Sequence, residues 1–248
     1  MDAALYVAMT GATQLMQAQR VNDANLANLN TVGFRAEVDA QTATPVGGPG
    51  LPSRVDAVLA PDGFDGANGT LQTTGNPLDI AVQGDHWIAV QAPDGTEAYT
   101  RAGDLHLTAN GQLVNAAGHP LLGDSGTPIA LPSSTSISIA DDGTISVVPS
   151  GNAPDAIAQM GRIKVVTAQP SQLERGADGL FHPVDGTPLP AAAGSTITVG
   201  ALESSNVDPV GALVQMIQIS RQFSLQTQFM NTLNQDGQAG TSLLTLSA

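Results

Sequence analysis

A serine within Gly-Asp-Ser-Gly is the first feature of the chain that could do chemistry. Residues 123 to 126 copy the four residues around the nucleophile of trypsin-like serine proteases. Such a serine needs a positioned histidine base and an oxyanion hole. Four histidines could serve, but none has a recognisable sequence context: His86, His106, His119 and His182. Because Gly, Asp and Ser are common turn residues, a hairpin turn is favoured and no catalytic residue is predicted.

Metal binding is the second chemistry to consider. The histidines lack the spacing of metal ligands, and the carboxylates lack the Asp-x-Asp-x-Asp-Gly run and closing Glu of an EF-hand. The carboxylates in turn-like segments are Asp79, Asp85, Asp104, Asp124, Asp141 and Asp142. Turn capping is their favoured role, and we predict no metal and no cofactor. A carboxylate pair for glycoside hydrolysis stays open, since such pairs form only in space.

Composition excludes several classes of partner. With 42% hydrophobic and 12% charged residues in 248, the chain can bury a core and is not of the disordered type. Its net charge is −14 and its few basic residues form no cluster, which argues against nucleic acid and anionic membranes. No run approaches the ~20 apolar residues of a membrane helix. The N-terminus does not read as a cleaved secretory signal, so we expect neither membrane insertion nor cleavage.

The first 30 residues predict a helix, because few breakers interrupt Asp2 to Asn30. The helix should end in the asparagine-rich stretch before Gly33, since Asn and Gly tolerate a left-handed closing turn. Steps of three and four residues form a heptad-like seam with two polar positions. The seam consists of Leu5, Ala8, Ala12, Leu15, Gln19, Asn22, Leu26 and Leu29.

The middle of the chain predicts β structure. Proline and glycine exclude a long helix from residues 36 to 74, which read as an extended connector with at most an edge strand or hairpin. Apolar runs such as Trp87 to Val90 follow and indicate strands. Five Asp-Gly or Asn-Gly pairs between the runs are typical of tight hairpins, and they begin at Asp94, Asn110, Asp142, Asp178 and Asp185. An antiparallel β domain is therefore expected over residues 75–204.

The last segment predicts a second helix from about Val207 to Leu244, with Asp208 as N-cap and Pro209 in the first turn. One apolar seam runs along Ala212, Met216, Ile219, Phe223, Gln226, Met230 and Leu233. A second stripe lies beside it at Val210, Leu213, Val214 and Ile217. Two apolar stripes on one helix indicate more than one neighbour, which favours assembly with other chains. From patterning alone, a two-helix hairpin packed on the chain's own β domain is the alternative.

Several segments, in order along nearly the whole chain, resemble one known family. Residues 25 to 35 read Asn-Leu-Ala-Asn-Leu-Asn-Thr-Val-Gly-Phe-Arg, which is similar to the signature of flagellar basal-body rod proteins. Other blocks resemble the family's β domain and its C-terminal helix; they are residues 74–85, 97–103, 111–114, 200–209 and 216–223. Together the blocks are specific to that family.

The resemblance implies a structural, non-enzymatic rod subunit. Its unfolded chain would leave through the flagellar type III export apparatus without cleavage and assemble helically in the periplasm. The terminal helices would line the export channel, with the β domain outside, and the rod would transmit torque. Its partners would be copies of itself and other rod subunits. Segments 161–166 and 173–181 look more like the proximal than the distal rod subunit.

The prediction is thus an α+β chain in which the N- and C-terminal helices form a coiled-coil-like pair around an antiparallel β-rich middle. Its expected parts are 1–35 and 205–248 as the polymerisation core, 36–74 as connector and 75–204 as β domain. A distal rod subunit and a secreted β-domain binding module are the alternatives. The predicted assembly interface comprises Leu5, Ala12, Leu15, Asn22, Asn25, Leu26, Asn28, Leu29, Val210, Leu213, Val214, Met216, Ile217, Ile219, Phe223, Met230 and Leu233. Asn25 and Asn28 are expected to hydrogen-bond between subunits.

Overall fold

The structure is a computed structural model that describes residues 3–45, 55–151, 156–194 and 196–246. The chain forms two compact units. The first, here called the helical unit, comprises Met1–Ala27, Glu37–Asp62 and Asp208–Ala248. The second, here called the β unit, comprises Asn28–Ala36 and Gly63–Val207. Helices and antiparallel strands together confirm the predicted α+β class.

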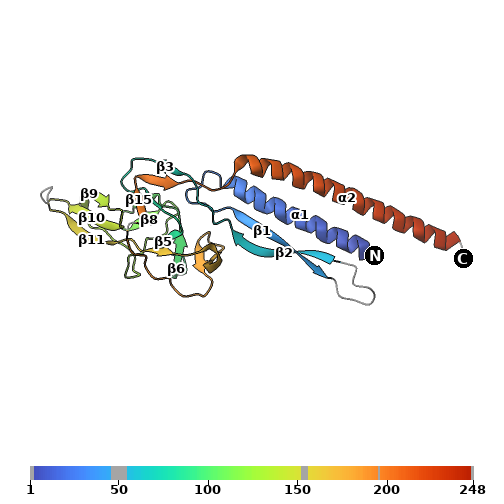
Figure 1. The fold of residues 1–248 in the computed structure, drawn as a ribbon, viewed down its shortest axis with the longest axis horizontal. Helices are drawn as coiled ribbons and strands as arrows, with labels where there is room; N and C mark the ends of the chain where they lie inside the picture. Colours follow the sequence, from blue (N-terminus) through green and yellow to red (C-terminus); the bar gives the residue numbers. More distant parts are fainter. Residues whose placement is uncertain (1–2, 46–54, 152–155, 195, 247–248) are drawn as a thin grey trace. The chain divides into compact units, whose positions relative to one another are not determined.

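Two long helices dominate the helical unit. Helix α1 spans Ala3–Ala27 and helix α2 spans Pro209–Leu246, and they lie side by side (Figure 1). Strands β1 (Glu37–Pro45) and β2 (Val55–Phe64) form a two-stranded sheet next to them, inside the segment expected as a connector. No helix in the described part of the chain has the length and apolar character needed to cross a lipid bilayer.

The helix ends follow the signals in the sequence. Helix α1 ends at Ala27, three residues before the expected limit, and a turn leads to Gly33, whose φ is 66°. Asp208 caps α2, because its carboxylate accepts a hydrogen bond of 3.1 Å from the Val210 amide. This is the N-cap predicted from Asp-Pro, and it satisfies one of the amide groups that a helix leaves unpaired at its start.

The β unit is built from small antiparallel sheets. The largest has the strand order β12-β5-β6-β14-β13, and a second has the order β11-β10-β9. Three further strand pairs are β15-β4, β16-β3 and β7-β8. The strands are β3 (Leu71–Thr73), β4 (Ile80–Val82), β5 (His86–Gln91), β6 (Glu97–Thr100), β7 (Leu105–Leu107), β8 (Leu113–Asn115), β9 (Ser134–Ile139), β10 (Thr144–Pro149), β11 (Ala158–Arg162), β12 (Val165–Thr167), β13 (Leu173–Arg175), β14 (Phe181–Pro183), β15 (Ile197–Val199) and β16 (Ala201–Glu203), with a 3-10 turn at Pro170–Gln172.

The central strands of the five-stranded sheet are buried on both faces. On β5, Ile88 and Val90 join an aliphatic core, whereas Trp87 and Ala89 join a smaller core that contains Phe64 and Phe181. Successive residues of a strand point to opposite faces, so a continuous apolar run is what a strand covered on both sides requires. The rings of Phe64 and Phe181 pack on each other edge to face, with centroids 4.5 Å apart.

The predicted Asp-Gly and Asn-Gly turns are confirmed. All five of their glycines have φ values between 66° and 87°. Four of the turns connect neighbouring strands, namely β5 to β6, β7 to β8, β9 to β10 and β13 to β14. The Gly-Asp-Ser-Gly segment also forms a turn, as predicted. Its Ser125 hydroxyl contacts the Thr127 hydroxyl at 2.8 Å.

Candidate assembly interface

The predicted seams of the two helices meet within the chain. Asn22 donates a hydrogen bond of 3.0 Å to the Ala212 carbonyl, and Gln226 donates one of 2.8 Å to the Ala8 carbonyl. Advancing along α1 from Ala8 to Asn22 therefore moves backward along α2, so the helices are antiparallel. Of the seam residues, Ala8, Ala12, Asn22, Ala212 and Ile219 are buried, while Leu5, Leu15, Leu26, Met216, Met230 and Leu233 are partly buried. Phe223, predicted in the same seam, is 38% exposed.

Polar seam residues fix the register of this pair. A buried amide must find a partner, because leaving it unpaired costs about 1–3 kcal/mol. In the observed register, Asn22 and Gln226 each find a main-chain carbonyl of the facing helix. Gly11 lets Gln226 approach, since a Cβ atom at Gly11 would lie 3.0 Å from the Gln226 Nε2 atom.

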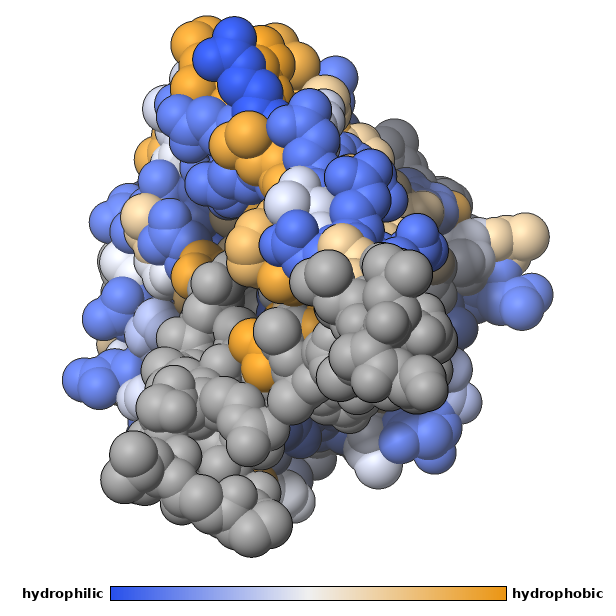
Figure 2. All heavy atoms as spheres, turned by 90° about the vertical axis from the view of Figure 1, so that its right-hand side faces the viewer, coloured by the Kyte–Doolittle hydropathy of each residue, from blue (hydrophilic) through white to orange (hydrophobic). Residues whose placement is uncertain are grey.

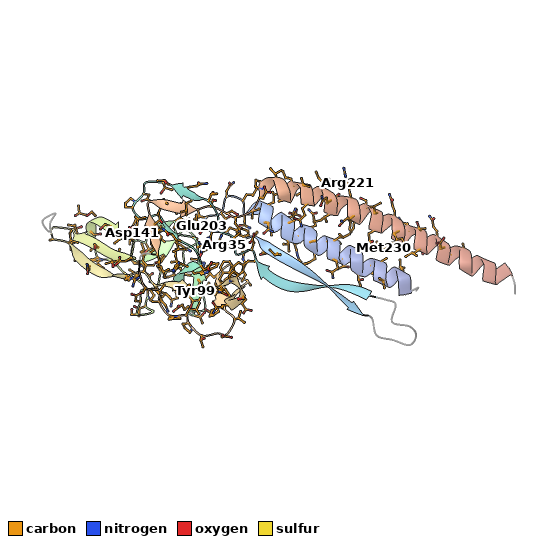
Figure 3. The ribbon with its side chains drawn as sticks, viewed as in Figure 1. Arg35, Tyr99, Asp141, Glu203, Arg221 and Met230 are labelled. Atoms are coloured by element: carbon orange, nitrogen blue, oxygen red, sulfur yellow. The ribbon has the colours of Figure 1, made fainter. Side chains whose placement is uncertain are left out.

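The second stripe of α2 is exposed. We call Val210, Leu213, Val214, Ile217, Leu225 and Phe229 the outer stripe, and each is 49–69% exposed. At about 100° of rotation per residue, Ile217 and the buried Ile219 lie on opposite sides of the helix. Figure 3 shows the same opposition farther along, with Arg221 on the side away from α1 and Met230 on the side toward it. Leu225 and Phe229 were not among the predicted stripe residues, although they follow Ile217 and Arg221 in steps of four.

The motif asparagines have partners within the chain. The Asn25 side chain pairs with the main chain of Glu37, donating at 2.9 Å and accepting at 2.8 Å, as a neighbouring strand would. Asn28 accepts a hydrogen bond of 3.0 Å from the Thr31 hydroxyl. Asn28 and Leu29 lie beyond the end of α1. Asn25 thus holds the start of β1 in place, a role that its position in the motif did not predict.

A fully buried ion cluster lies in the β unit. Glu203, at the end of β16, contacts Arg35 at 3.0 Å and Arg101 at 2.7 Å. The same carboxylate accepts a hydrogen bond of 2.8 Å from the Gly69 amide. These three charged side chains are only 1–2% exposed. Figure 3 shows Arg35 and Glu203 close together, so the segment that ends the rod-like motif and the one that precedes α2 meet at one carboxylate.

The two arginines are held by further contacts. Arg101 donates to the carbonyls of Val82, Gly84 and His86, at 2.7 to 3.0 Å. Both guanidinium groups lie over the Trp87 ring, at 5.5 and 5.9 Å from its centre, within the range of cation–π attraction. Burial lowers the pKa of Arg35, and the nearby charge of Arg101 lowers it further. Glu203 therefore provides the negative charge that keeps two buried cations in place.

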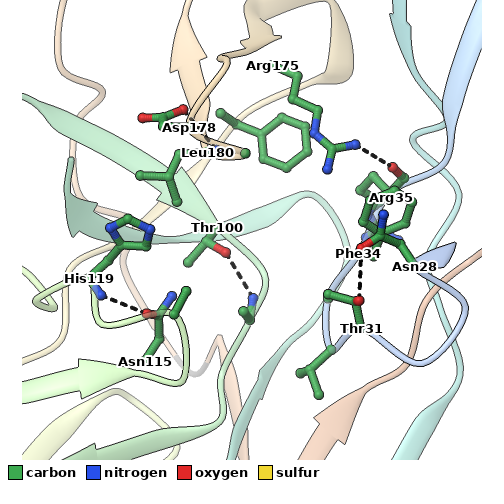
Figure 4. A pocket seen from close by; sticks show the side chains of 16 residues that line it. Asn28, Thr31, Phe34, Arg35, Thr100, Asn115, His119, Arg175, Asp178 and Leu180 are labelled. Carbon is green, nitrogen blue, oxygen red and sulfur yellow. Dashed lines mark hydrogen bonds between the residues drawn. The ribbon is translucent and has the colours of Figure 1, made fainter. Parts of the chain in front are cut away.

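A cavity of about 210 Å³ opens beside this cluster (Figure 4). One wall is residues 31 to 35 and the other walls come from the loops around Thr100, Asn115 and Leu180. Arg175 lies 4.5 Å above the Phe34 ring and donates to the Arg35 carbonyl at 3.3 Å. His119 and Asp178 line the cavity, but Asp178 contacts His182 instead, at 3.1 Å. Within the described residues no group of three or more His, Asp or Glu could hold a metal ion.

Among the carboxylates predicted to cap turns, Asp104 has surroundings that disfavour its charged form. Its Oδ1 atom is buried and accepts no hydrogen bond from the described residues. Burial raises the pKa of Asp104, opposed by backbone amides of Asp104 and Ala116, and the Asp79 charge raises it too. By contrast, the Thr96 hydroxyl and amide lower the pKa of Asp94. Asp79 accepts hydrogen bonds from the side chains of Thr74 and Asn76. Asp142 caps its turn as predicted, because its carboxylate accepts a hydrogen bond of 2.9 Å from the Thr144 amide.

These opposite shifts predict opposite pH dependences. A raised carboxyl pKa weakens the fold as pH rises from the ordinary value, about 3.9, to the folded value. Asp104→Asn should therefore gain stability relative to the parent chain as pH rises above about 4, the ordinary carboxyl pKa. Asp94→Asn should lose stability relative to the parent chain as pH rises toward about 4, because the lowered pKa of Asp94 stabilises the parent fold there. Urea midpoints followed by Trp87 fluorescence measure both, and parallel curves for Asp104→Asn and parent would contradict the first expectation.

The comparisons with known proteins agree with this architecture. Residues 5–35 match the family model for flagella basal body rod proteins, and residues 198–243 match the C-terminal model of flagellar basal body rod FlgEFG proteins. Residues 81–147 match the D1 domain model of the flagellar hook protein FlgE/F/G. Gly33 and Arg35 lie inside the match to residues 5–35, and Glu203, which contacts Arg35, lies inside the match to residues 198–243.

Full-length relatives are similar across the whole chain. The flagellar basal-body rod protein FlgF of Salmonella typhimurium and that of Escherichia coli are each 40% identical, covering 100% of both chains. The rod protein FlgG of Agrobacterium fabrum is 29% identical, over 94% of this chain and 95% of its own. The chain therefore belongs to the flagellar basal-body rod protein family, as a structural, non-enzymatic subunit of the flagellar rod that is most like FlgF.

Proposed function

We propose that the subunit assembles helically through α1 and α2 into the proximal part of the rod, with copies of itself and other rod subunits as neighbours. The observation that carries this proposal is the exposed outer stripe of α2. Burying one large aliphatic or aromatic side chain contributes roughly 1.5–3 kcal/mol, so six such residues in water favour a partner strongly. A patch of this kind on a soluble protein is typical of an interaction site.

The antiparallel helices are proposed to act as a coiled-coil-like pair. Their contacts repeat after the same interval on both helices, since Ala8 and Asn22 are as far apart as Ala212 and Gln226. That interval is two heptads. Helix α2 is also the longer helix and continues past the N-terminal end of α1 (Figure 1). A single helix with Gly237 and Gly240 in its extension gains stability only by packing, which neighbours in the rod would provide.

The route to the rod follows from the same proposal. The chain would pass unfolded through the flagellar type III export apparatus, without cleavage, and fold in the periplasm as it joins the growing rod. Marginal seams that contain Asn22, Gln19 and Gln226 are compatible with this, because helices with polar seams depend on their neighbours for stability. The greater similarity to FlgF than to FlgG supports the proximal over the distal position.

Ile217→Glu tests the proposal. A charge in the outer stripe should leave the subunit folded but abolish its incorporation, because a buried, unpaired carboxylate costs several kcal/mol at an interface. In the native bacterium lacking its own copy, the variant should give no swimming and be absent from purified basal bodies. Gln215→Glu adds the same charge on an exposed position outside the stripe and should support swimming. Normal incorporation of Ile217→Glu would contradict assembly through this stripe.

A further inference from the structure

The helical unit carries a second unfilled apolar surface, on the side where its helices meet. An open groove of about 530 Å³ runs between α1 and α2. It is lined by Leu15, Met16 and Gln19 of α1 and by Met216, Ile219, Ser220 and Phe223 of α2. Met16 is 62% exposed there. From Met216 to Phe223 the groove is about 10 Å long, enough for roughly two turns of another helix.

The groove and the outer stripe lie on different faces of α2. The groove uses Met216 and Ile219, which face α1, whereas Ile217 and Leu225 face away from it. Figure 2, seen from the end that holds both chain termini, shows apolar surface broken by hydrophilic residues rather than one continuous patch. One copy cannot cover its own stripe with its own groove, so a contact that uses both joins two chains.

Each surface has a charged side chain beside it, and these two differ in sign, although the exposed Arg20 also lies on the groove side, one helical turn after Met16. Arg221 lies within the outer stripe, between Ile217 and Leu225, and makes no ion pair with the described residues. Next to the groove, the exposed carboxylate of Asp23 is held by Gln19 at 2.8 Å. A stripe docked lengthwise in the groove can bring the guanidinium to this carboxylate. Such a pair contributes little energy but selects the register in which the helices meet.

We propose that the groove at Leu15, Met16 and Phe223 receives the outer stripe of a second copy of this chain, with Leu225 and Phe229 as anchors. This inference rests on the proposed assembly through α1 and α2 and names the surfaces that join copies. Because each copy offers one groove and one stripe, the contact is heterologous. Heterologous contacts repeat along a ring or an open helix, which is the growth that a rod needs, whereas a two-fold contact stops at a dimer.

Cysteine cross-linking tests this pairing, since the chain has no cysteine of its own. The full chain carrying both Met16→Cys and Phe229→Cys is assembled in the native bacterium, and purified basal bodies are oxidised with copper phenanthroline. One groove thiol and one stripe thiol per copy should give a ladder of disulfide-linked dimers, trimers and larger species. Within one chain the two positions lie on different faces and more than two helical turns apart along the pair, so they cannot join to each other.

The controls separate the possible outcomes. Chains with Met16→Cys alone or Phe229→Cys alone carry one thiol each, so neither should give species larger than a dimer. Dimers without higher species would contradict heterologous docking, and basal bodies that contain the chain without any cross-link would overturn the groove–stripe pairing while leaving the proposed function intact. Absence of the parent chain from basal bodies would instead contradict the proposed function.

Adding Arg221→Glu to the double-cysteine chain tests the charge match. The ladder should decrease several-fold and recover when Asp23→Arg is added as well, since the reversed pair restores opposite charges. A ladder that the Arg221→Glu change leaves unaltered would show that these charges do not set the register.

Discussion

Glu203→Ala is expected to destabilise the β unit by about 3–5 kcal/mol, the usual result of removing one partner from a buried ion pair. The reason is the imbalance of the cluster: without Glu203, Arg35 and Arg101 remain buried, both positive, with no anion beside them. The Gly69 amide also loses its acceptor. Domains of this size are stable by only about 5–15 kcal/mol, so the effect should be large.

Trp87 makes the measurement specific. It is the chain's only tryptophan, it is buried, and both guanidinium groups lie over its ring, so its fluorescence reports on this part of the β unit. The urea midpoint should fall strongly for Glu203→Ala and less for Glu203→Gln, which keeps an acceptor for the Gly69 amide. Glu174→Ala removes an exposed carboxylate from β13 and should change stability by less than about 0.5 kcal/mol. Equal midpoints for Glu203→Ala and Glu174→Ala would show that the cluster contributes no net stability.

Much of this fold could be predicted from short segments of the sequence, because turn residues and apolar runs indicate where strands and hairpins form. Asp-Gly and Asn-Gly pairs require positive φ, and the run from Trp87 to Val90 needs cover on both faces, so hairpins and a buried sheet follow from short segments. The seams of α1 and α2 likewise follow from spacing. Periodicity also separated the outer stripe from the seam, although it did not extend the stripe to Leu225 and Phe229.

The buried cluster could not be predicted from spacing. Arg35, Arg101 and Glu203 are far apart in the sequence, and each is of a type that usually lies on the surface. Their meeting depends on how β16, β6 and the segment after α1 pack in space. The family signature indicated that residues around Gly33 and Glu203 matter, but gave no physical reason. The structure provides one, since both segments are held by the same carboxylate and by adjoining main-chain contacts.

Those main-chain contacts explain why the motif contains glycine. The Gly33 amide donates a hydrogen bond of 2.8 Å to the Glu203 carbonyl, so the main chain and the side chain of Glu203 both bind the motif segment. At Gly33 the φ is 66°, and a Cβ atom would lie 2.3 Å from the Arg101 carbonyl carbon and 2.5 Å from the Ala102 nitrogen. The main chain at Gly33 therefore lies so close to the main chain of Arg101 and Ala102, just after β6, that there is no room for a side chain at residue 33.

Gly33→Ala is accordingly expected to destabilise the β unit by roughly 3–4 kcal/mol, near the upper end of single-residue effects. About 1–2 kcal/mol comes from placing a non-glycine residue at positive φ, and the rest from moving main chain that the methyl group would strike. Gly118→Ala separates the two contributions, because Gly118 has a φ of 86° but a Cβ atom added there would meet nothing within 4 Å. It should show the conformational part alone in the same urea titration of Trp87 fluorescence. If the two variants lose equal stability, the close approach of residue 33 to Arg101 is not what requires glycine in the motif, and backbone conformation alone is sufficient.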